Sequence, residues 1–517
     1  MECSLVASEE QVERGSPVGL FGKGSNLFMT GIPSRGESPI PDAGEGSPGI
    51  YRAGTLIYTK STLALLFCWI LWGDFCFTFM ETVTPSIMPL KLQDLKASNF
   101  EMGMILGTVP GIISVFLNPV ISFKSDRYRS RWGRRIPFIL GSLPFLVLSI
   151  VGLAFSGPIG NWVQHHVHVP GSWLSPQLLA LSSIGILLIG FTFFNSFVTS
   201  IFYYLFNDVV PEQLLSRFMA WFRCIASLSS AIYSFFIFQY AGTHSTEILL
   251  GAALVYFFGF GLMCIKVKEG DYPPPPPLIH GKSGPLASIQ TYSRDCHSHS
   301  HYWYQWIWTF LGSVGGGVNI FGLFYSLAIG LNLKQIGEIN GSSSLANMVC
   351  VFFAGWLADR YHPIRIVIVG NILGWLVLTP CSMIWLFWHP SSETVFWIRL
   401  VQTVLLAAPI GAMCAMADPP LLMRIFPRDR YGQFCSTNFL WRTIGGIIGG
   451  SIAGIFLDMV TGWVGKERAY LYIPVWHFVF GLPCLICVIL LYRSWKKYGG
   501  DEAYVPPIPD YGIGPHF

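Results

Sequence analysis

Residues 124–156 read KSDRYRSRWGRRIPFILGSLPFLVLSIVGLAFS. Six of the first twelve residues are lysine or arginine, and the run Ile136–Ser156 that follows has no charged side chain. An α-helix needs about 20 consecutive apolar residues to cross the hydrocarbon core of a bilayer. The stretch therefore predicts a transmembrane helix that begins directly after a strongly basic loop.

The composition of the whole chain agrees with a membrane protein. Of its 517 residues, 52% are hydrophobic and 12% are charged, whereas soluble proteins are about 25% charged. The apolar runs are continuous, unlike the alternating strands of about 10 residues that build a membrane barrel, and a helix satisfies its own backbone in lipid. We therefore expect an all-α polytopic membrane protein, and we exclude a soluble enzyme, a nucleic-acid-binding protein and a disordered chain.

Twelve apolar segments are long enough to cross a membrane. The weakest is 341–358, because it starts with the polar residues Ser342–Ser344. At about 20 residues per crossing, the predicted spans are 61–88, 101–123, 136–156, 178–206, 217–240, 247–266, 303–330, 341–358, 364–387, 394–417, 435–457 and 470–492.

Basic residues are distributed unevenly between the connections. The connections Gly157–Gln177 and Trp388–Glu393 contain no lysine or arginine. Besides the loop after the second span, basic residues gather near the ends of the tenth and twelfth spans, at Arg424, Arg428, Arg430, Arg493, Lys496 and Lys497. Because basic residues favour the cytoplasmic side, we expect both termini in the cytoplasm and the protein in the inner or plasma membrane.

The remaining segments suggest five regions. We expect a disordered cytoplasmic tail at 1–60, a six-helix bundle at 61–266, a cytoplasmic linker at 267–302, a second six-helix bundle at 303–492 and a cytoplasmic tail at 493–517. The linker holds a proline run and then CHSHSH, residues 296–301. These histidines could bind a metal, but we interpret the segment as a solvated linker and expect neither a metal nor a cofactor. We interpret the cysteines as small buried hydrophobic residues.

Two pairs of segments recur at matching places in the two halves. SDRYR, beginning at Ser125, follows the second span, and ADRYH, beginning at Ala358, follows the eighth. PEQLLSRF (Pro211–Phe218) follows the fourth span, and PRDRYGQF (Pro427–Phe434) follows the tenth. Two related six-span halves that start on the same side indicate a parallel repeat about an axis along the membrane normal.

The first of these loops carries a family signature. DRYRSRWGRRIPFI (Asp126–Ile139) resembles the loop between the second and third helices of major facilitator superfamily transporters. Ser122 holds the place of the first glycine of the usual motif, and four extra residues separate Asp126–Arg127 from Gly133–Arg134–Arg135. This longer form, followed by Pro-Phe-Ile, resembles the sucrose/maltose proton symporters and, less closely, the glycoside–pentoside–hexuronide cation symporters.

The resemblance implies a major facilitator fold and a gate at the cytoplasmic side. Asp126 would pair with an arginine or a helix N-terminus in one access state and lose that contact in the other. The alternative is a basic loop that only obeys the charge rule for cytoplasmic loops. The positions that match the motif are Asp126, Arg127, Gly133, Arg134 and Arg135 in the first half and Asp359 and Arg360 in the second.

The sequence departs from the sucrose family in the fourth helix. That helix carries an aspartate and an arginine used for proton and sugar in the family. When NDVV at Asn207 is aligned to the family's helix end, the two places hold Thr192 and Tyr203. The coupling mechanism of the family therefore does not transfer directly.

Two acidic residues lie inside the first predicted span. Asp74 and Glu81 are seven residues apart, so they share a helix face about 10 Å apart along the axis. A charge at this depth costs at least about 2.5–3.5 kcal/mol, and a desolvated carboxylate can exchange protons near neutral pH. We predict that Asp74 or Glu81 carries a coupled proton; the alternative is a structural acid paired with an arginine or a backbone group.

Other polar residues at depth are candidates for binding the solute. Amides both donate and accept hydrogen bonds, as sugar hydroxyls require, and an indole can stack on a sugar ring. Helix–helix hydrogen bonds for the amides, and arginines that extend to the interface, are the alternatives. The predicted substrate-binding residues are Trp72, Asn195, Arg223, Asn319, Asn438 and Arg442.

These observations lead to one expectation about function. We expect a transporter, not an enzyme, that moves a sugar or glycoside by alternating access with a co-transported cation, most simply a proton. Sodium-coupled or uncoupled transport of another small polar solute, and a non-transporting sensor, remain alternatives. The expected partners are the small solute, the cation and membrane lipid, with no nucleic acid, and the expected state is a monomer.

Overall fold

The computed structural model describes residues 50–166, 176–272 and 296–507, all within one unit of the chain, Gly46–Phe517. Twelve helical segments of this part are long and apolar enough to cross a membrane. The predicted all-α fold with twelve transmembrane helices is therefore confirmed. Several crossings contain a short π-helical or 3₁₀ turn, labelled η, between two α-helical pieces.

The first six crossings occupy the N-terminal half of the chain. A further helix, α5 (Ser156–His166), follows the third crossing. The crossings are α1 (Lys60–Asp94), α2–η1–α3 (Asn99–Gly103, Met104–Thr108 and Val109–Arg127), α4 (Ile136–Ala154), α6 (Pro176–Val209), α7–η2–η3 (Glu212–Ile232, Tyr233–Ile237 and Phe238–Tyr240) and α8–η4–α9 (Ser245–Val255, Tyr256–Phe260 and Gly261–Lys266).

The other six crossings form the C-terminal half, and α21 (Gly500–Ala503) follows them. They are α11–η5–α12 (Ser300–Gly316, Gly317–Phe321 and Gly322–Ala328), α13 (Leu333–Arg360), α14–η6–α15–η7 (Pro363–Leu373, Gly374–Leu378, Thr379–Met383 and Ile384–Leu386), α16–η8–α17 (Ser392–Gln402, Thr403–Ala407 and Ala408–Ile425), α18 (Tyr431–Val464) and α19–η10–α20 (Lys466–Ala469, Tyr470–Tyr472 and Ile473–Lys497). The short η9 (Arg428–Arg430) precedes α18.

The eighth crossing, α13, begins well before the polar residues that made it the weakest predicted span. Asn332 caps the helix: its side chain accepts a hydrogen bond from the backbone N–H of Gln335, whose own side chain accepts one from the N–H of Asn332. This reciprocal cap satisfies two N–H groups that a helix start leaves free. The serines at 342–344 therefore lie inside the helix and do not mark its start.

A hairpin precedes α1, where we expected the end of a disordered tail. Its strands, β1 (Ile50–Ala53) and β2 (Leu56–Thr59), pair antiparallel. Gly54 in the turn has a φ of 57°, in the left-handed region that glycine adopts without strain. The hydroxyl of Thr55 accepts a hydrogen bond of 2.8 Å from the N–H of Asp271, which follows the sixth crossing. The hairpin is thus tied to the start of the predicted linker.

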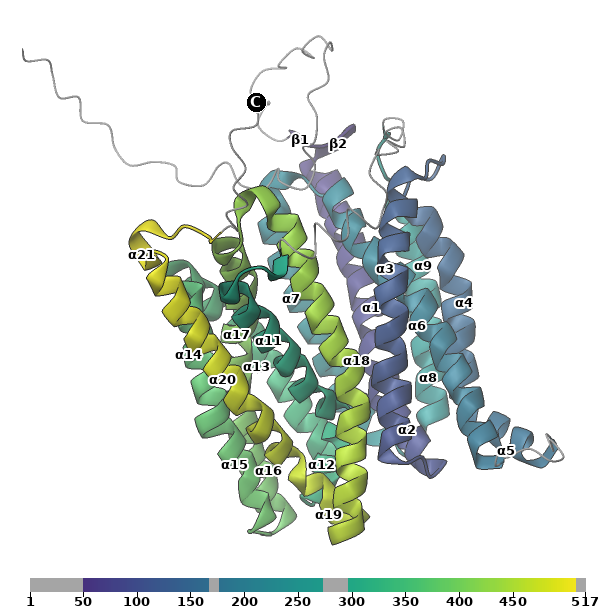
Figure 1. Ribbon diagram of the computed structural model, residues 1–517. Helices are drawn as coiled ribbons and strands as arrows, with labels where there is room; N and C mark the ends of the chain where they lie inside the picture. Colours follow the sequence, from purple (N-terminus) through teal and green to yellow (C-terminus); the bar gives the residue numbers. More distant parts are fainter. Residues whose placement is uncertain (1–49, 167–175, 273–295, 508–517) are drawn as a thin grey trace, which may run out of the picture. The chain divides into compact units, whose positions relative to one another are not determined.

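The helix ends define two sides of the bundle. Because the crossings alternate in direction, α1 begins and α20 ends on the same side, where the loop 128–135 and Lys496–Lys497 also lie. We call this the basic side, at the top of Figure 1, and the opposite one the far side.

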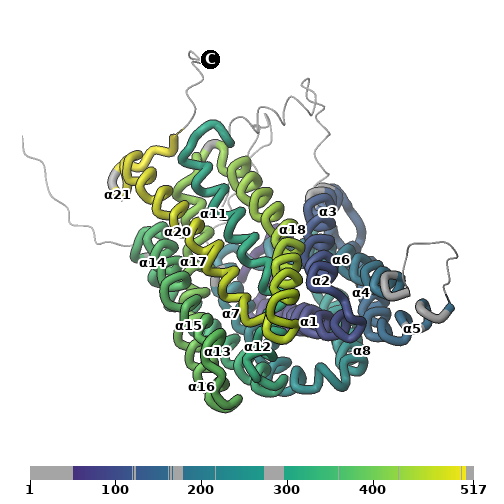
Figure 2. Tube along the Cα trace, turned by 60° about the horizontal axis from the view of Figure 1, so that its bottom comes forward, coloured from purple at the N-terminus to yellow at the C-terminus, as the bar shows by residue number. Residues whose placement is uncertain are grey.

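The two halves meet closely on the far side. The start of α2 lies against the end of α18, as Figures 1 and 2 show. A Cβ atom on Gly103 would lie 2.2 Å from the carbonyl oxygen of Gly450, and one on Gly454 would lie 2.4 Å from that of Asn99. Only glycine permits backbones to approach so closely.

The second line of contact joins α13 to the fifth crossing. A Cβ atom on Gly337, near the start of α13, would lie 2.3 Å from the carbonyl oxygen of Ser234 in η2. Both residues are near the far-side ends of their crossings. The fifth and eighth crossings therefore repeat the close contact that the second and eleventh make.

An acidic side chain reinforces the contact between the halves. The carboxylate of Asp458, near the end of α18, accepts hydrogen bonds from the N–H of Asn99 (3.1 Å), the side-chain amide of Asn99 (2.8 Å) and the N–H of Phe100 (2.9 Å). The hydroxyl of Tyr470 donates to the side-chain oxygen of Asn99 at 2.8 Å. Asp458 thus caps the first turn of a helix that belongs to the other half, where a negative charge is favoured.

The histidine-rich end of the linker is folded, contrary to the expectation of a solvated segment. The ring of His301 is fully buried and lies 2.8 Å from the hydroxyl of Ser494 and 3.0 Å from that of Tyr504. The ring of His299 lies 3.0 Å from the hydroxyl of Tyr498. Within the described part of the chain, no group of three His, Cys, Asp or Glu side chains can hold a metal ion. These residues join the linker to the C-terminal tail.

Candidate functional site

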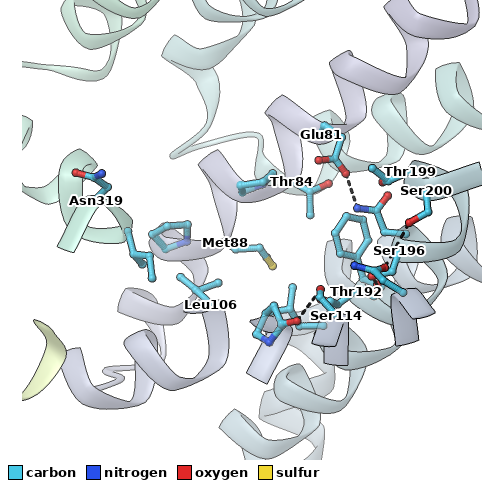
Figure 3. Close-up of a pocket in the computed structure, with 18 residues that line it drawn as sticks. Glu81, Thr84, Met88, Leu106, Ser114, Thr192, Ser196, Thr199, Ser200 and Asn319 are labelled. Carbon is cyan, nitrogen blue, oxygen red and sulfur yellow. Dashed lines mark hydrogen bonds between the residues drawn. The ribbon is translucent and has the colours of Figure 1, made fainter. Parts of the chain in front are cut away.

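A cavity of about 540 Å³ lies where the two halves approach each other, with ten of its eighteen lining residues labelled in Figure 3. Most of its wall comes from α1, α3 and α6 of the N-terminal half, and η5 of the C-terminal half contributes Asn319 and Ile320. Three of the predicted site residues are brought together here, namely Glu81, Asn195 and Asn319.

Glu81 and Asn195 form the polar centre of the cavity. The side-chain N–H of Asn195 donates to the Glu81 carboxylate at 2.5 Å, and the amide oxygen of Asn195 is buried without a partner among the described residues. Pro85 follows Glu81 by four residues and has no N–H, so the helix gives the Glu81 carbonyl no donor. The cavity therefore offers both an unpaired acceptor and a carboxylate.

Small polar residues of α6 extend this polar surface. Sequence analysis selected only Asn195 among them, although the spacing was visible: they recur three to four residues apart in an apolar helix and so share one face. One of them, Thr192, occupies the place at which the sucrose family carries a charged residue. The polar residues that α6 contributes to the cavity are Thr192, Asn195, Ser196, Thr199 and Ser200.

Asp74 does not line this cavity. Its side chain is 1% exposed; one carboxylate oxygen accepts a 3.4 Å hydrogen bond from Thr78, and the other has no partner among the described residues. The exposed Arg223 lies within electrostatic range of Asp74, and Trp72, 45% exposed, stacks on Phe75 with ring centres 5.9 Å apart. The predicted group therefore divides: Glu81, Asn195 and Asn319 line the cavity, whereas Trp72, Asp74 and Arg223 do not.

The two remaining predicted binding residues lie in the C-terminal half and differ in environment. Asn438 is buried, and its side-chain oxygen accepts hydrogen bonds from Thr309 (2.9 Å) and Gln305 (3.2 Å). This is the helix–helix hydrogen bonding that we stated as the alternative. The exposed Arg442 instead forms a 2.7 Å ion pair with Asp418, which sequence analysis missed because the two residues are 24 positions apart.

The basic loop of the N-terminal half forms a network of ion pairs. Arg135 pairs with Asp126 at 2.7 Å and with Asp208, at the end of α6, at 3.0 Å, while Arg134 pairs with Asp208 at 2.6 Å. Arg127 lies at the end of α3. The contact that the resemblance implied for Asp126 is therefore made within its own half.

Glu269, which follows the sixth crossing, completes this network. Its carboxylate accepts hydrogen bonds from the backbone N–H groups of Arg134 (2.9 Å), Arg135 (2.9 Å) and Ile136 (2.6 Å), at the start of α4. Gly133 has a φ of 97°, and a Cβ atom there would lie 2.4 Å from the Glu269 carboxyl carbon, so no other residue fits. Sequence analysis did not select Glu269, which lies a few residues before the proline run of the predicted linker.

Tyr272, at the start of the linker, contacts two members of this network, Glu269 and Arg134. Burial, together with the nearby Asp208 and Glu269, raises the pKa of its hydroxyl. The hydroxyl therefore keeps its proton and donates to Glu269 at 2.9 Å, while the ring lies against Arg134 with 4.2 Å between its centre and the guanidinium carbon.

The matching loop of the C-terminal half is simpler. Arg360 lies over the ring of Trp356 at 5.5 Å. The side chain of Asp359 lies outside the described residues. The ring of His362, the last residue of ADRYH, packs on Trp495 with 4.4 Å between ring centres.

Comparison with known proteins identifies the family. A profile of the family described as "MFS/sugar transport protein" matches residues 60–493. The chain therefore belongs to this family of the major facilitator superfamily, whose members are multi-pass membrane transporters that work by alternating access.

Solved structures of low sequence identity share the fold. A bacterial homologue of the iron transporter ferroportin, in an inward-facing state, matches with a TM-score of 0.61, 13% identity and coverage of 83% of this chain and 99% of that one. A D-xylose–proton symporter matches with a TM-score of 0.57, 11% identity and coverage of 83% and 98%. The nucleoside transporter NupG matches with a TM-score of 0.56, 10% identity and coverage of 82% and 98%.

A curated relative matches over a shorter stretch. The multidrug export protein EmrB of Haemophilus influenzae is 24% identical over 187 residues, which are 36% of this chain and 32% of that protein. The chain therefore spans about a third of the length of this relative, and the match bears on neither substrate nor direction of transport.

Proposed function

We propose that the protein moves a sugar or a glycoside across the membrane together with a proton. The observation that carries the proposal is the Glu81–Asn195 pair inside a cavity lined by hydroxyl and amide side chains. Its volume of about 540 Å³ falls within the ~300–1,000 Å³ of small-molecule sites. Hydroxyls and amides match the mixed donors and acceptors of a sugar.

Glu81 is the first candidate for the proton carrier, and Asp74 is the second. A carboxylate that touches the solute cavity can exchange its hydrogen-bond partner for a proton when the solute binds. Asp74 lies about 10 Å away along the same helix and interacts electrostatically with Arg223. It would pass the proton on toward the basic side. The proton would then move from Glu81 to Asp74 as the solute crosses.

The closed far side and the basic loop suggest an orientation and a gate. We propose that the basic side faces the cytoplasm, as the charge rule favours, and that the chain is held in its inward-facing state. The contacts of Asp458 keep the far side shut in this state. When the protein changes its access state, the pair of Asp126 with Arg135 would break, as the resemblance of the loop implies, and the pairs of Asp208 with both arginines would rearrange with it.

Transport in reconstituted vesicles tests the proposal. Purified full-length protein in liposomes should accumulate labelled sucrose or maltose under an imposed proton gradient and not under a sodium gradient alone. Accumulation that requires sodium, or is independent of any gradient, would favour the alternative of another coupling. Binding of either sugar without flux would favour a sensor.

Variants of the two acids test the site. Glu81→Gln and Asp74→Asn should lose accumulation against a gradient but keep exchange of labelled for unlabelled sugar, because exchange needs no net proton movement. Glu393→Gln removes an exposed acid on the far side and should behave as the unmodified protein. If Glu81→Gln and Asp74→Asn both keep gradient-driven accumulation, the proton assignment is wrong.

A further inference from the structure

A second pocket lies inside the C-terminal half, toward the basic side. It has a volume of about 390 Å³ and is lined by α11, α14, α17 and α18. Asp418 precedes the end of α17 by seven residues, which places it about 10 Å from the basic side. None of the residues that line this pocket lines the cavity around Glu81.

The ion pair of Asp418 and Arg442 forms one wall of this pocket. One oxygen of the Asp418 carboxylate lies 2.7 Å from the Arg442 guanidinium, whereas the other is buried without a partner among the described residues. The Asp418 side chain is 21% exposed and that of Arg442 is 52% exposed. One carboxylate oxygen of Asp418 is thus bound by Arg442, and the other can accept a hydrogen bond from a ligand. Arg442 has further N–H groups that can donate to the same ligand.

The helix supplies another acceptor at the same place. Pro419 and Pro420 follow Asp418 inside α17, and neither has an N–H. The carbonyl of Ala415, which lines the pocket, therefore has no helical donor at Pro419.

The chemistry of the wall indicates which ligand fits. The ion pair has no net charge, so it favours neither a free anion nor a free cation. It presents acceptors and donors side by side, and Trp308 provides an indole ring at the same pocket. An aromatic face beside paired donors and acceptors suits a neutral ring that carries several hydroxyl groups.

We propose that this pocket is a second binding site for the transported solute, taking a neutral polyhydroxylated ring between the Glu81 cavity and the basic side. Asp418 and the Ala415 carbonyl accept hydrogen bonds from its hydroxyl groups, Arg442 donates to them, and Trp308 packs on its apolar face. The proposal rests on the proposed function and adds a place where the solute pauses on its way in or out.

The variant Gly312→Val tests the pocket without touching the ion pair. Gly312 lines the pocket, and a Cβ atom there would have no neighbour within 4 Å, so the larger side chain fills the space without a backbone clash. Gly251→Val is its control, because Gly251 also has open space at its Cβ but belongs to α8, outside both pockets. Asp418→Asn removes the charge, and Asp501→Asn, which breaks the exposed pair with Arg365, is the matched control.

The readout is the KM for sucrose and maltose in liposomes, with the size-exclusion profile of each purified variant as a check of folding. Asp418→Asn should raise KM about tenfold, the effect of one lost hydrogen bond to a charged group. Gly312→Val should raise KM by at least as much, because its side chain occupies the space that the sugar needs. At saturating sugar they should still accumulate it under a proton gradient, and both controls should stay near the unmodified KM.

The outcomes separate this proposal from the proposed function. If the unmodified protein transports sugar and both pocket variants keep its KM, the second site is refuted and the proposed function stands. If the unmodified protein neither binds nor transports either sugar, both proposals fall. If Asp418→Asn does not fold, Gly312→Val alone decides.

Discussion

The Glu81 carboxylate has one hydrogen-bond donor among the described residues, in a cavity lined by both polar and apolar side chains. The donor is the amide of Asn195, from a helix more than a hundred positions away in the chain. Removing a partner from a buried charged group costs more than forming the bond contributes, because the remaining group is left desolvated. Substitution of Asn195 should therefore lower the stability of the protein more than substitution of the neighbouring serine and threonine residues on α6.

Replacement of Asn195 tests this sensitivity. Asn195→Ala should lower the free energy of unfolding by about 1–3 kcal/mol, because Glu81 loses its donor. In a Glu81→Gln background the same replacement should cost less, since a neutral amide is cheaper to leave unpaired. Thermal unfolding of the purified protein measures both effects. Ser196→Ala, which removes a bond of Ser196 to its own helix, is the control, and equal losses in the two backgrounds would refute the coupling.

His362 provides a prediction about pH. Burial, followed by the charge of Arg424, lowers the pKa of His362 to about 4 from the ordinary 6.5. The folded protein therefore keeps this ring neutral down to about pH 4, while the unfolded chain binds a proton below about pH 6.5. The unfolded state is favoured as pH falls through this window, so the free energy of unfolding should fall from pH 6.5 to pH 4.

In the unmodified protein, the His362 ring accepts a hydrogen bond of 3.3 Å from the backbone N–H of Ile364. The variant His362→Asn removes the titrating imidazole but keeps an acceptor for this hydrogen bond. The drop in melting temperature between pH 6.5 and pH 4.5 should become smaller. His389→Asn, at an exposed histidine, should leave the drop unchanged. An undiminished drop in His362→Asn would show that other groups cause it.

At the scale of the helix, the sequence predicted where the membrane crossings lie but not how they are joined. Length and apolar content suffice for the first task, so all twelve segments were found. Of the five π-helical turns in the described crossings, η1, η6 and η8 each end two residues before a proline, at Pro110, Pro380 and Pro409, a signal that sequence analysis did not use. Pairs between different helices, such as Asp418 with Arg442, depend on packing that spacing along the chain does not encode.

The candidate site shows the same division. Glu81, Asn195 and Asn319 were selected because polar residues in apolar helices need a reason to be there, and the structure gathers them at one cavity. Asn438 satisfied the same criterion and serves another purpose, since its partners are two neighbouring side chains of α11. Polarity at depth therefore predicts that a residue has a partner, but not whether that partner is protein or solute.

The contact of Asp458 with the start of α2 leads to a prediction about the state of the transporter. Asp458→Asn keeps the size of the side chain but loses the charge that the helix start attracts. The far side should therefore open more often, by a shift of about 0.3–1 kcal/mol for one charge at a helix end. Distances between spin labels placed at the far-side ends of α2 and α18 should show a larger open population.

Glu467→Gln is the control for this experiment, because Glu467 is an exposed acid near the same side, in α19. It should leave the distribution of distances as it is in the unmodified protein. A distribution that Asp458→Asn does not change would mean that the glycine contacts alone hold the far side shut.

For the whole molecule, the distribution of basic residues predicts the orientation. Tags at the two termini should be reached by antibody only after cells are permeabilised. A cysteine introduced at His389, in the loop between the ninth and tenth crossings, should react with a membrane-impermeant thiol reagent on intact cells. The reverse pattern would place the basic side outside and would turn the proposed inward-facing state into an outward-facing one.

The linker is fastened at both of its ends. Asp271 holds one end to the hairpin before α1, and the histidines at 299 and 301 hold the other end to the C-terminal tail. A break in the polypeptide between residues 272 and 296 would leave each anchor with its own six helices. Two separately translated fragments should therefore reassemble into a working transporter.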